Sequence, residues 1–311
     1  MMVQFEPCLG GGDLRIVTLA TCYNRRDHTL DSLSDLHQQQ LADGVLLQHV
    51  IVDDGSSDGT ADAVREQFPD VEIVKGNGQL YWAGGMRHGW AEAVAGRKFD
   101  YLFVYNDDVS LSPDAIADLL AASESVWQEN PCHVIAGSFK SSDGGQTTYG
   151  GRLRSSSWHP LKFAGMVEPN GRVQRADTLN MNGALITAEA LKKVGFLSDY
   201  FLHSGADFEF GLKLAKAGGA VYVAGQPIGE CDANPELGGG PTVSAFTPLR
   251  QRLGLIFDNK REPFRQRLCY YRQHGGVLWP VLWVSPYVTV WIRYAWDVLL
   301  RLAGRIDRNE G

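Results

Sequence analysis

The chain has 311 residues, of which 44% are hydrophobic and 21% charged, and this composition indicates a globular fold rather than disorder. The length suits one large α/β domain or two smaller ones. The formal net charge of -7 argues against nucleic acid as a partner, because proteins that bind nucleic acid usually carry a basic excess. The five cysteines have no CxxC spacing and suggest neither a disulfide framework nor a zinc site. Residues 1–13 lack the basic and apolar regions of a signal peptide, so a cytoplasmic protein is expected.

The first half of the chain alternates between short apolar runs and segments with helical spacing of leucines. In chain order these predict strand 14–22, helix 27–41, strand 46–52, helix 61–68, strand 71–75, helix 82–97 and strand 100–105. Such alternation predicts an α/β fold with a doubly wound sheet flanked by helices. In sheets of this kind ligands bind in the crevice beyond the carboxyl ends of the strands.

The second half is more mixed, and it ends in an aromatic tail. Further elements are expected as strands 133–139 and 183–187, helices 188–194 and 207–218, and Gly-rich loops 141–160 and 229–248. We therefore predict a domain over residues 1–248, followed by a C-terminal helical extension over residues 249–311.

The extension combines a basic segment with an uncharged one. Residues 250–272 hold seven Lys and Arg side chains against only Asp258 and Glu262, which suits an anionic surface or substrate. Residues 277–292 are almost free of charge, but they are fewer than the ~20 residues that a spanning helix needs. The segment predicts an interfacial membrane segment or a partner-binding helix pair, and a helix packed on the protein's own core is the alternative.

Acidic residues stand directly after two of the predicted strands. Asp53 and Asp54 follow strand 46–52, and Asn106-Asp107-Asp108 follows strand 100–105. Carboxylate oxygens are preferred ligands of Mg²⁺ and Mn²⁺, which often accompany a nucleoside diphosphate. Acidic residues are also common in solvated turns and helix caps. What indicates a ligand site is that both acidic clusters stand at the carboxyl ends of predicted strands.

Asp207 and Glu209 open the helix expected at 207–218. Acidic side chains are stabilised near a helix N-terminus by the helix dipole, which by itself explains one of them. Asp207 also follows a loop containing Gly205, where a general base facing a cleft would be placed.

These segments together resemble family 2 glycosyltransferases over about residues 14–225. The turn Val52–Thr60 is similar to the family's nucleotide-binding turn, and Asn106–Asp108 is similar to its DxD-type metal motif. The other segments that carry the resemblance are Gly76-Asn77-Gly78 with Gly84, Gly85 and Arg87; Asn182-Gly183-Ala184 with Gly195-Phe196; and Asp207-Phe208-Glu209 with Lys213 and Ala217-Gly218.

The resemblance implies a GT-A fold and an inverting transfer of sugar from a nucleotide-activated donor. It implies that Asp207 is the general base and that Asp108 binds a divalent metal, Mg²⁺ or Mn²⁺. The implied nucleotide-binding residues are Asp53, Asp54, Asn77, Arg87 and Asp107. The implied acceptor-binding residues are Trp82, Asn182, Gly183 and Glu209.

The segment Gln79–Met86 resembles rhamnosyltransferase-like members that build bacterial surface polysaccharides. This implies a dTDP- or UDP-sugar donor and a saccharide acceptor. With the aromatic tail, we expect a lipid-linked acceptor at the inner face of the cytoplasmic membrane. The sequence departs from the family at Asn106 and Ala206, which replace acids, and it offers only Glu230, Cys231 and Asp232 where some members have a metal-binding His.

Two other functions remain open. A sugar nucleotidyltransferase shares the architecture and the acidic site, but the segment Thr21–Arg25 does not look like its Gly-rich basic loop. A non-catalytic module that binds sugar or nucleotide is compatible with the loss of acids at Asn106 and Ala206. The sequence has no GxxxxGK[ST] or GxSxG motif, which argues against P-loop enzymes and serine hydrolases.

Overall fold

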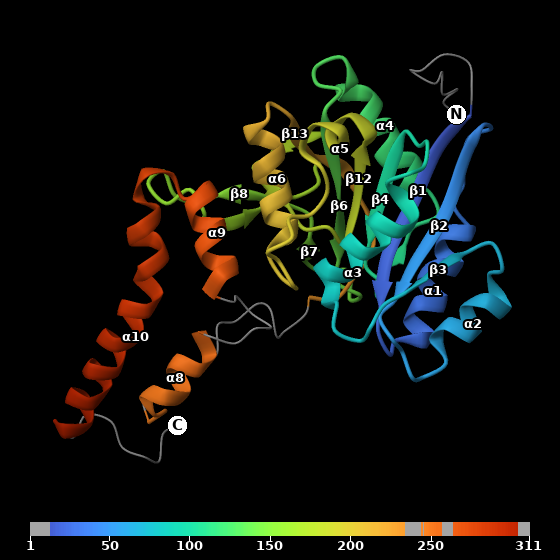
Figure 1. Cartoon of the computed structure of the whole chain (residues 1–311). Coiled ribbons are helices and arrows are strands. Elements are labelled where there is room, and N and C mark those ends of the chain that lie inside the picture. Colours follow the sequence, from blue (N-terminus) through green and yellow to red (C-terminus); the bar gives the residue numbers. More distant parts are fainter. Residues whose placement is uncertain (1–12, 234–243, 245, 257–263, 304–311) are drawn as a thin grey trace. The chain divides into compact units, whose positions relative to one another are not determined.

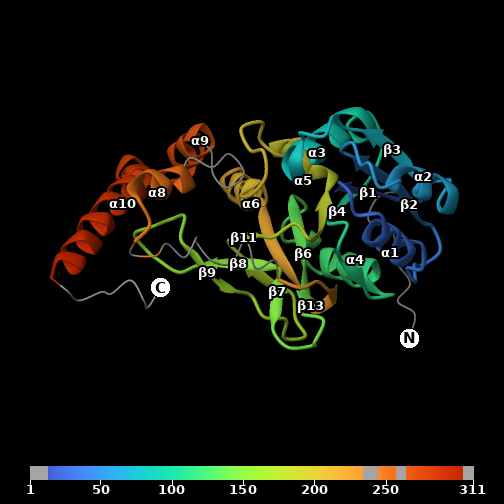
Figure 2. The ribbon, with the colours of Figure 1, turned by 90° about the horizontal axis from the view of Figure 1, so that it is seen from below.

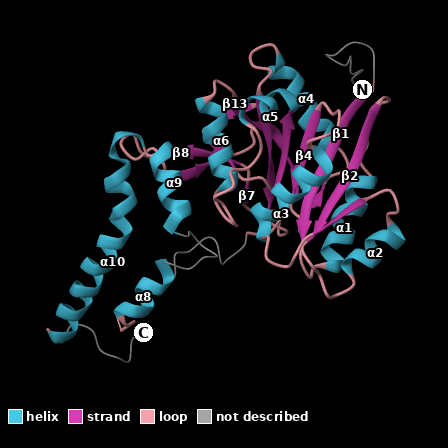
Figure 3. Ribbon diagram, viewed as in Figure 1, coloured by secondary structure: helices cyan, strands magenta, loops and turns pink. Residues whose placement is uncertain are grey.

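The computed structural model describes residues 13–233, 244, 246–256 and 264–303 (Figure 1). The chain divides into two compact units, residues 1–155 with 163–233, and residues 156–162 with 234–311. The large unit is mixed α/β and the small one is mainly helical (Figure 3). The boundary predicted at residue 248 stays a prediction.

A mixed sheet forms the centre of the large unit. Its main path runs β10-β13-β6-β12-β4-β1-β2-β3, and β5 and β7 pair with β13 and β6. The strand bounds are β1 Leu14–Cys22, β2 Val45–Asp53, β3 Glu72–Lys75, β4 Tyr101–Tyr105, β5 Ser110–Leu111, β6 His133–Lys140, β7 Thr147–Tyr149, β10 Gln174–Ala176, β12 Gly183–Thr187 and β13 Ala220–Glu230. A smaller sheet joins β8 (Gly151–Arg154), β9 (Phe163–Met166) and β11 (Thr178–Leu179).

The strands β4, β1, β2 and β3 run parallel, whereas β12 runs antiparallel to both β4 and β6. Parallel strands covered on both faces read as continuous apolar runs, and β4 is buried at every position. The fold prediction of a mixed α/β sheet flanked by helices is confirmed. Because β1 lies between β4 and β2, the residues that follow these three strands meet at one edge of the sheet.

Helices cover both faces of the sheet (Figures 1 and 2). The helices α1 (Arg26–His37) and α4 (Ala115–Trp127) lie on one face, and α2 (Thr60–Gln67) packs beside α1. The opposite face carries α3 (Tyr81–Gly89), α5 (Ala188–Val194) and α6 (Ala206–Lys216). All expected elements of the first half are present, although the helix predicted over 82–97 ends in a π-helical turn, Trp90–Val94.

Two long elements of the large unit, α4 and β13, were not predicted from the sequence. In β13 the pairing with β6 shifts register around Pro227, because proline cannot donate to the ladder. Because Pro227, Gly225 and Gly229 are all unfavourable in strands, the sequence pattern does not predict a strand here. The segment expected as a loop over 141–160 contains β7 and β8.

The small unit contains α8 (Leu249–Ile256), α9 (Phe264–His274), a 3₁₀ turn at Gly276–Leu278 and α10 (Trp279–Leu302). The aromatic tail is one helix, so the alternative of a helix pair is wrong for this segment. Pro286 lies inside α10 and cannot donate to the carbonyl of Leu282, but the Ser285 hydroxyl donates to that carbonyl at 2.9 Å. This replacement bond explains how the helix continues through the proline.

Candidate active site

Acidic residues stand at the carboxyl ends of β2 and β4, which are the two neighbours of β1 in the sheet. Asp53 pairs with Cys22 in the register of β1 and β2, and β4 lies on the other side of β1. The turn after β1 carries Asn24 and Arg25. The edge of the sheet therefore brings a basic side chain between the two acidic clusters.

Arg25 bridges the two aspartates that follow β4. Its Nη1 atom lies 3.2 Å from Asp107 Oδ1 and 2.6 Å from Asp108 Oδ2. The remaining oxygens, Asp107 Oδ2 and Asp108 Oδ1, are buried and have no hydrogen-bond partner among the described residues. Buried carboxylate oxygens without partners are costly, so this pair fits a further cation beside the guanidinium.

The pKa of Asp107 is shifted by the same burial of carboxylates. The pKa of Asp107 is raised to about 7, because burial, together with the charge of Asp108, outweighs the opposing effect of Arg25. A divalent cation would favour the ionised form of this carboxyl. The donor chemistry of Asp107 and Asp108 thus matches the predicted metal site.

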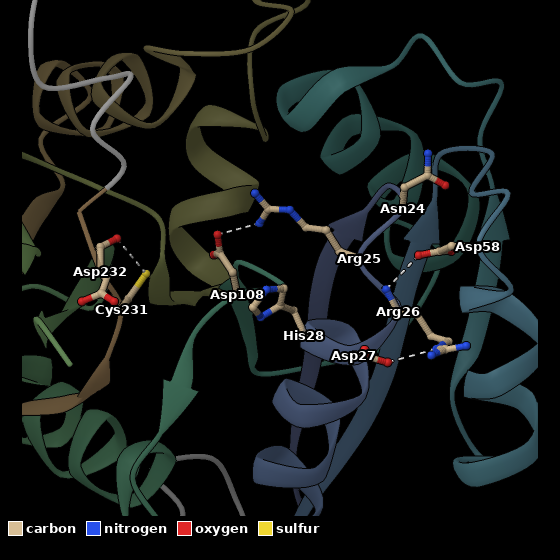
Figure 4. A pocket seen from close by; sticks show the side chains of 9 residues that line it. All are labelled: Asn24, Arg25, Arg26, Asp27, His28, Asp58, Asp108, Cys231 and Asp232. Carbon is tan, nitrogen blue, oxygen red and sulfur yellow. Dashed lines mark hydrogen bonds and ion pairs between the residues drawn. The ribbon is translucent and has the colours of Figure 1, made fainter.

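A cavity of about 750 Å³ opens beside this pair (Figure 4). Its volume lies within the range of small-molecule sites, which is roughly 300–1,000 Å³. The residues that line it come from the turn after β1, the start of α1, the turn after β2 and the segments that follow β4 and β13: Asn24, Arg25, Arg26, Asp27, His28, Asp58, Asp108, Cys231 and Asp232. Both acidic and basic groups face this space, which suits a ligand that arrives as an anion with a cation.

Asp53 and Asp54 differ in what their carboxylates do. Asp53 is 7% exposed, and its Oδ1 accepts one hydrogen bond, from Ser56 N at 2.9 Å. Asp54 accepts four backbone N–H groups at 2.8–3.2 Å, from Asn77, Gly78, Leu80 and Tyr81. Asp54 therefore fixes the backbone of residues 76–81, and Asp53 keeps more capacity for a ligand.

The glycine-rich segment after β3 is explained by this arrangement. A Cβ on Gly76 would lie 2.5 Å from Asp54 Oδ1, and Gly78 has a positive φ of 82°. Only glycine lets the chain approach the carboxylate so closely and turn in this way. Asn77 is exposed, and its Oδ1 accepts from Gln79 N at 2.9 Å, which leaves its amide nitrogen open to solvent.

Asp207 is the second residue of α6, and its surroundings suit a group that accepts and releases a proton. Its Oδ1 accepts from Phe208 N at 2.8 Å, and its Oδ2 lies 3.4 Å from Asn180 Nδ2. Arg152 Nε in turn donates to Asn180 Oδ1 at 3.0 Å. Burial raises the pKa of Asp207 above its ordinary value, although these hydrogen bonds and the charge of Arg152 oppose the shift.

A short segment links Asp207 to the acidic edge of the sheet. The backbone N–H of Asn106 donates to the carbonyl of Asn182 at 3.1 Å, while Asn180 contacts Asp207. Residues 180 and 182 are two positions apart, a span of at most about 7 Å. Asp207 therefore lies close to the residues that precede Asp107 and Asp108.

Trp82 also contacts the acidic edge, because its indole Nε1 donates to Asn106 Oδ1 at 2.9 Å. Asn182 is buried, with its Nδ2 3.8 Å from Cys231 Sγ. Gly183 is buried in β12, and a Cβ there would lie 2.8 Å from Phe139 Cζ. Trp82 and Asn182 thus lie beside Asn106, whereas Gly183 is required for close packing against Phe139.

Arg87 and Glu209 lie in another network. Arg87 Nη1 donates to the carbonyls of Ser198 and Phe201 at 3.0 and 2.6 Å. Glu209 is 0% exposed, and its Oε2 accepts from the Ser198 hydroxyl at 2.9 Å. Both side chains thus hold the segment before α6 in place.

Three residues of the site, Arg25, Asn180 and Arg152, were not predicted from the sequence. Arg25 carries a signal that was available, because it follows the first strand of a parallel sheet and so stands at the ligand edge. Asn180 lies in a segment without a predicted element, and Arg152 lies in the predicted loop over residues 141–160. Arg152 is placed by β8 of the small sheet and reaches Asp207 only through Asn180. Of the three residues offered in place of a metal-binding His, Cys231 and Asp232 line the cavity, whereas Glu230 pairs with Ser110.

Comparison with known proteins adds the family context. The sequence matches the family model described as glycosyl transferase family 2 over residues 19–181. No match to a curated protein sequence reaches significance. Among solved structures, the chain is similar to the mannosyltransferase PcManGT from Pyrobaculum calidifontis in complex with GDP-Man and Mn²⁺, with a TM-score of 0.52, 16% identity, and coverage of 94% of this chain and 76% of that one. It is also similar to S. aureus TarS 1-349 in complex with UDP, with a TM-score of 0.50, 14% identity, and coverage of 83% and 70%.

Proposed function

Because the chain belongs to glycosyl transferase family 2, we propose that it moves a sugar from a nucleotide diphosphate sugar to a saccharide acceptor with inversion at the anomeric carbon. The observation that carries this proposal is the pair of buried, unpartnered oxygens on Asp107 and Asp108 beside a cavity of about 750 Å³. Such a pair suits a divalent metal with a diphosphate. PcManGT, which shares the fold, was solved with GDP-Man and Mn²⁺.

Asp108, with Asp107 beside it, would hold the metal, either Mg²⁺ or Mn²⁺. When bound, the metal supplies charge stabilisation to the leaving diphosphate. Asp53 would contact the nucleoside through its free oxygen. Asp54 would act indirectly, because its carboxylate shapes the loop that carries Asn77.

Asp207 would act as the general base that takes the proton of the acceptor hydroxyl. Asn180 donates to one of its oxygens and so orients the carboxylate, while Arg152 orients Asn180. Trp82 and Asn182 both hydrogen-bond Asn106 at the acidic edge, and an acceptor sugar would stack there on the indole ring of Trp82. Arg87 and Glu209 would act indirectly, because their hydrogen bonds to residues 198–201 hold the segment before α6 in place.

The test is thermal unfolding of the whole chain with UDP, dTDP, GDP and CDP, each with and without Mn²⁺. A ligand that binds only the folded state stabilises it by about 2.7 kcal/mol at a hundred times its Kd. We expect a metal-dependent rise in Tm with one diphosphate, most readily dTDP or UDP. No rise with any of them would contradict the nucleotide-sugar proposal. Binding without turnover of any donor would favour the non-catalytic module instead.

We propose further that the acceptor is lipid-linked and that α10 lies on the membrane surface that presents it. One face of α10 is apolar and exposed, within an arc of ~140° at 100° per residue. It consists of Val281, Val284, Val288, Trp291, Ile292, Trp296, Leu299 and Leu302. Arg252 pairs with Asp297 at 2.6 Å on the other side of the helix and is 5% exposed.

A membrane fits this face better than a second copy of the chain does. Trp291 and Trp296 are 54% and 61% exposed, and tryptophan favours the interface between lipid and water. The exposed arginines Arg250, Arg265 and Arg272 of α8 and α9 suit anionic headgroups. None of the helices in the described segments has the length and apolar character needed to cross a bilayer, so α10 would lie in the plane of the interface.

Vesicle flotation tests this proposal with the double variant Trp291→Ser and Trp296→Ser. We expect wild type to bind vesicles that contain anionic lipid and the variant to bind at least tenfold more weakly, because burial of each large apolar side chain is worth about 1.5–3 kcal/mol. Trp158→Ser is the matched control, since Trp158 is 65% exposed but lies outside α10. Unchanged flotation of the double variant would contradict the proposal. A dimer that dissociates in the double variant, without vesicle binding, would assign the face to a second copy.

A further inference from the structure

Two histidines and an aspartate meet on the large unit away from the acidic edge. His37 ends α1, His49 lies within β2, and Asp70 lies in the turn before β3. One donor atom from each residue lies within 4.8 Å of the others. His49 precedes Asp53 by four positions along the strand, about 13 Å, so the cluster is separate from the proposed nucleotide site.

The hydrogen bonds of the histidines leave one nitrogen of each ring for a ligand. His37 Nδ1 lies 2.8 Å from the carbonyl of Leu33, which can only accept, so Nδ1 carries the hydrogen. Its Nε2 then faces Asp70 Oδ2 at 3.0 Å. His49 Nδ1 lies 3.0 Å from the Thr18 hydroxyl, and no hydrogen bond within the described part of the chain engages its Nε2.

This pattern is the one that metal-binding histidines show in proteins. A ligating histidine almost always gives its other ring N–H to a carbonyl, carboxylate or water, which fixes the tautomer and the ring orientation. Leu33 O and the Thr18 hydroxyl occupy those positions here. The rings of His37 and His49 are stacked, with centroids 4.5 Å apart and an interplanar angle of 28°, and this contact brings their nitrogens near Asp70.

We propose that His37, His49 and Asp70 bind a divalent transition metal such as Zn²⁺ as a site distinct from the one at Asp108. Two imidazoles and one carboxylate form a donor set of the kind that selects transition metals over Mg²⁺. The metal would join the end of α1, the middle of β2 and the turn before β3, three segments that are distant in sequence.

The chemistry of the residues supports metal binding over a plain ion pair. His49 is 6% exposed, and the Thr18 hydroxyl engages its Nδ1, so Nε2 is the ring nitrogen that remains for a cation. The contact between His37 and Asp70 leaves His49 Nε2 without a hydrogen bond in the described part of the chain, whereas a metal held by all three residues would engage it.

The experiment uses the whole chain, free of any histidine tag and chelator-treated, in an Asp108→Ala background so that the proposed catalytic metal cannot bind there. Co²⁺ is titrated while visible d–d absorption is recorded, and Zn²⁺ is added in thermal unfolding. We expect one equivalent of Co²⁺ to bind, Zn²⁺ to displace it, and Tm to rise by about 5 °C or more at a hundred times Kd.

The variants His37→Gln and Asp70→Asn are both at the surface and should each abolish the Co²⁺ absorption and the Zn²⁺-dependent rise in Tm. His88→Gln is the matched control, because His88 bonds the Lys75 carbonyl outside the cluster and should leave both signals intact. In the native Asp108 background, His37→Gln should keep the Mn²⁺-dependent response to nucleotide, which separates this site from the proposed function. Absence of Co²⁺ absorption, or Co²⁺ absorption that persists in both surface variants, would overturn the proposal.

Discussion

Asp207→Asn should lower kcat by about 10²–10⁴-fold, the usual contribution of a general base. Asparagine keeps the size of the side chain and can still accept from Phe208 N, so the start of α6 should be preserved. Because Asp207 would act on the acceptor, the metal-dependent rise in Tm with the donor nucleotide should be unchanged. Initial rates with saturating donor and thermal unfolding measure the two effects separately.

The pH profile offers a second view of the same residue. A general base must be ionised, so kcat/KM should fall as the pH falls through the pKa of Asp207. Burial raises that pKa, and the acidic limb should therefore lie at higher pH than the ordinary value for an aspartate, about 3.9. Asn180→Ala removes a hydrogen bond to the ionised form and should shift the limb further toward high pH.

The charge control for this experiment is Asp62→Asn on α2. Asp62 is exposed and pairs only with Arg65 in the described structure, so its rate and pH profile should match wild type. If Asp207→Asn retains more than about a tenth of the wild-type kcat, Asp207 is not the base. If it loses the nucleotide response as well, the substitution has disturbed the site as a whole and the assignment to proton transfer fails.

The sequence predicts the edge of the sheet where the chemistry would occur, because that edge follows from local patterns. Apolar runs locate β2 and β4, and parallel connectivity then brings Asp53 and Asp108 to one side. The helix that begins near Asp207 was equally visible from its glycine stop and acidic first turn. These features depend on short segments and on rules that hold for any doubly wound sheet.

What the sequence could not predict is how individual carboxylates are used. Asp53 and Asp54 are adjacent and chemically identical, yet one accepts a single hydrogen bond and the other accepts four from a loop about 23 residues later. The same limit applies to Glu209, which points into the protein although its place in a helix N-terminus resembles that of Asp207. Side-chain partners that are distant in sequence decide these roles, and no local pattern records them.

At the proposed metal site, Arg25 would compete with the metal for the same carboxylates. Its guanidinium contacts both Asp107 and Asp108, so a metal that binds there must share or displace it. Asp108→Asn removes one ligand charge, and the affinity for Mn²⁺ should fall by about 100-fold or more, because loss of even an outer-shell partner costs 10–100-fold. Arg25→Gln should act in the opposite direction on Mn²⁺ alone, since it removes the competing charge from both carboxylates.

Mn²⁺ binding to the nucleotide-free chain, followed by calorimetry or by the relaxation of water protons, distinguishes these variants. Asp114→Asn is the charge control, because Asp114 precedes α4 and lies outside the cavity. Weaker Mn²⁺ binding in Arg25→Gln would mean that Arg25 organises the carboxylates for the metal rather than competing with it. Unchanged binding in Asp108→Asn would place the metal elsewhere and remove the observation on which the proposed function rests. The two variants are expected to change the affinity for Mn²⁺ in opposite directions. If the substitutions merely unfolded the edge of the sheet, Asp108→Asn and Arg25→Gln would both weaken Mn²⁺ binding.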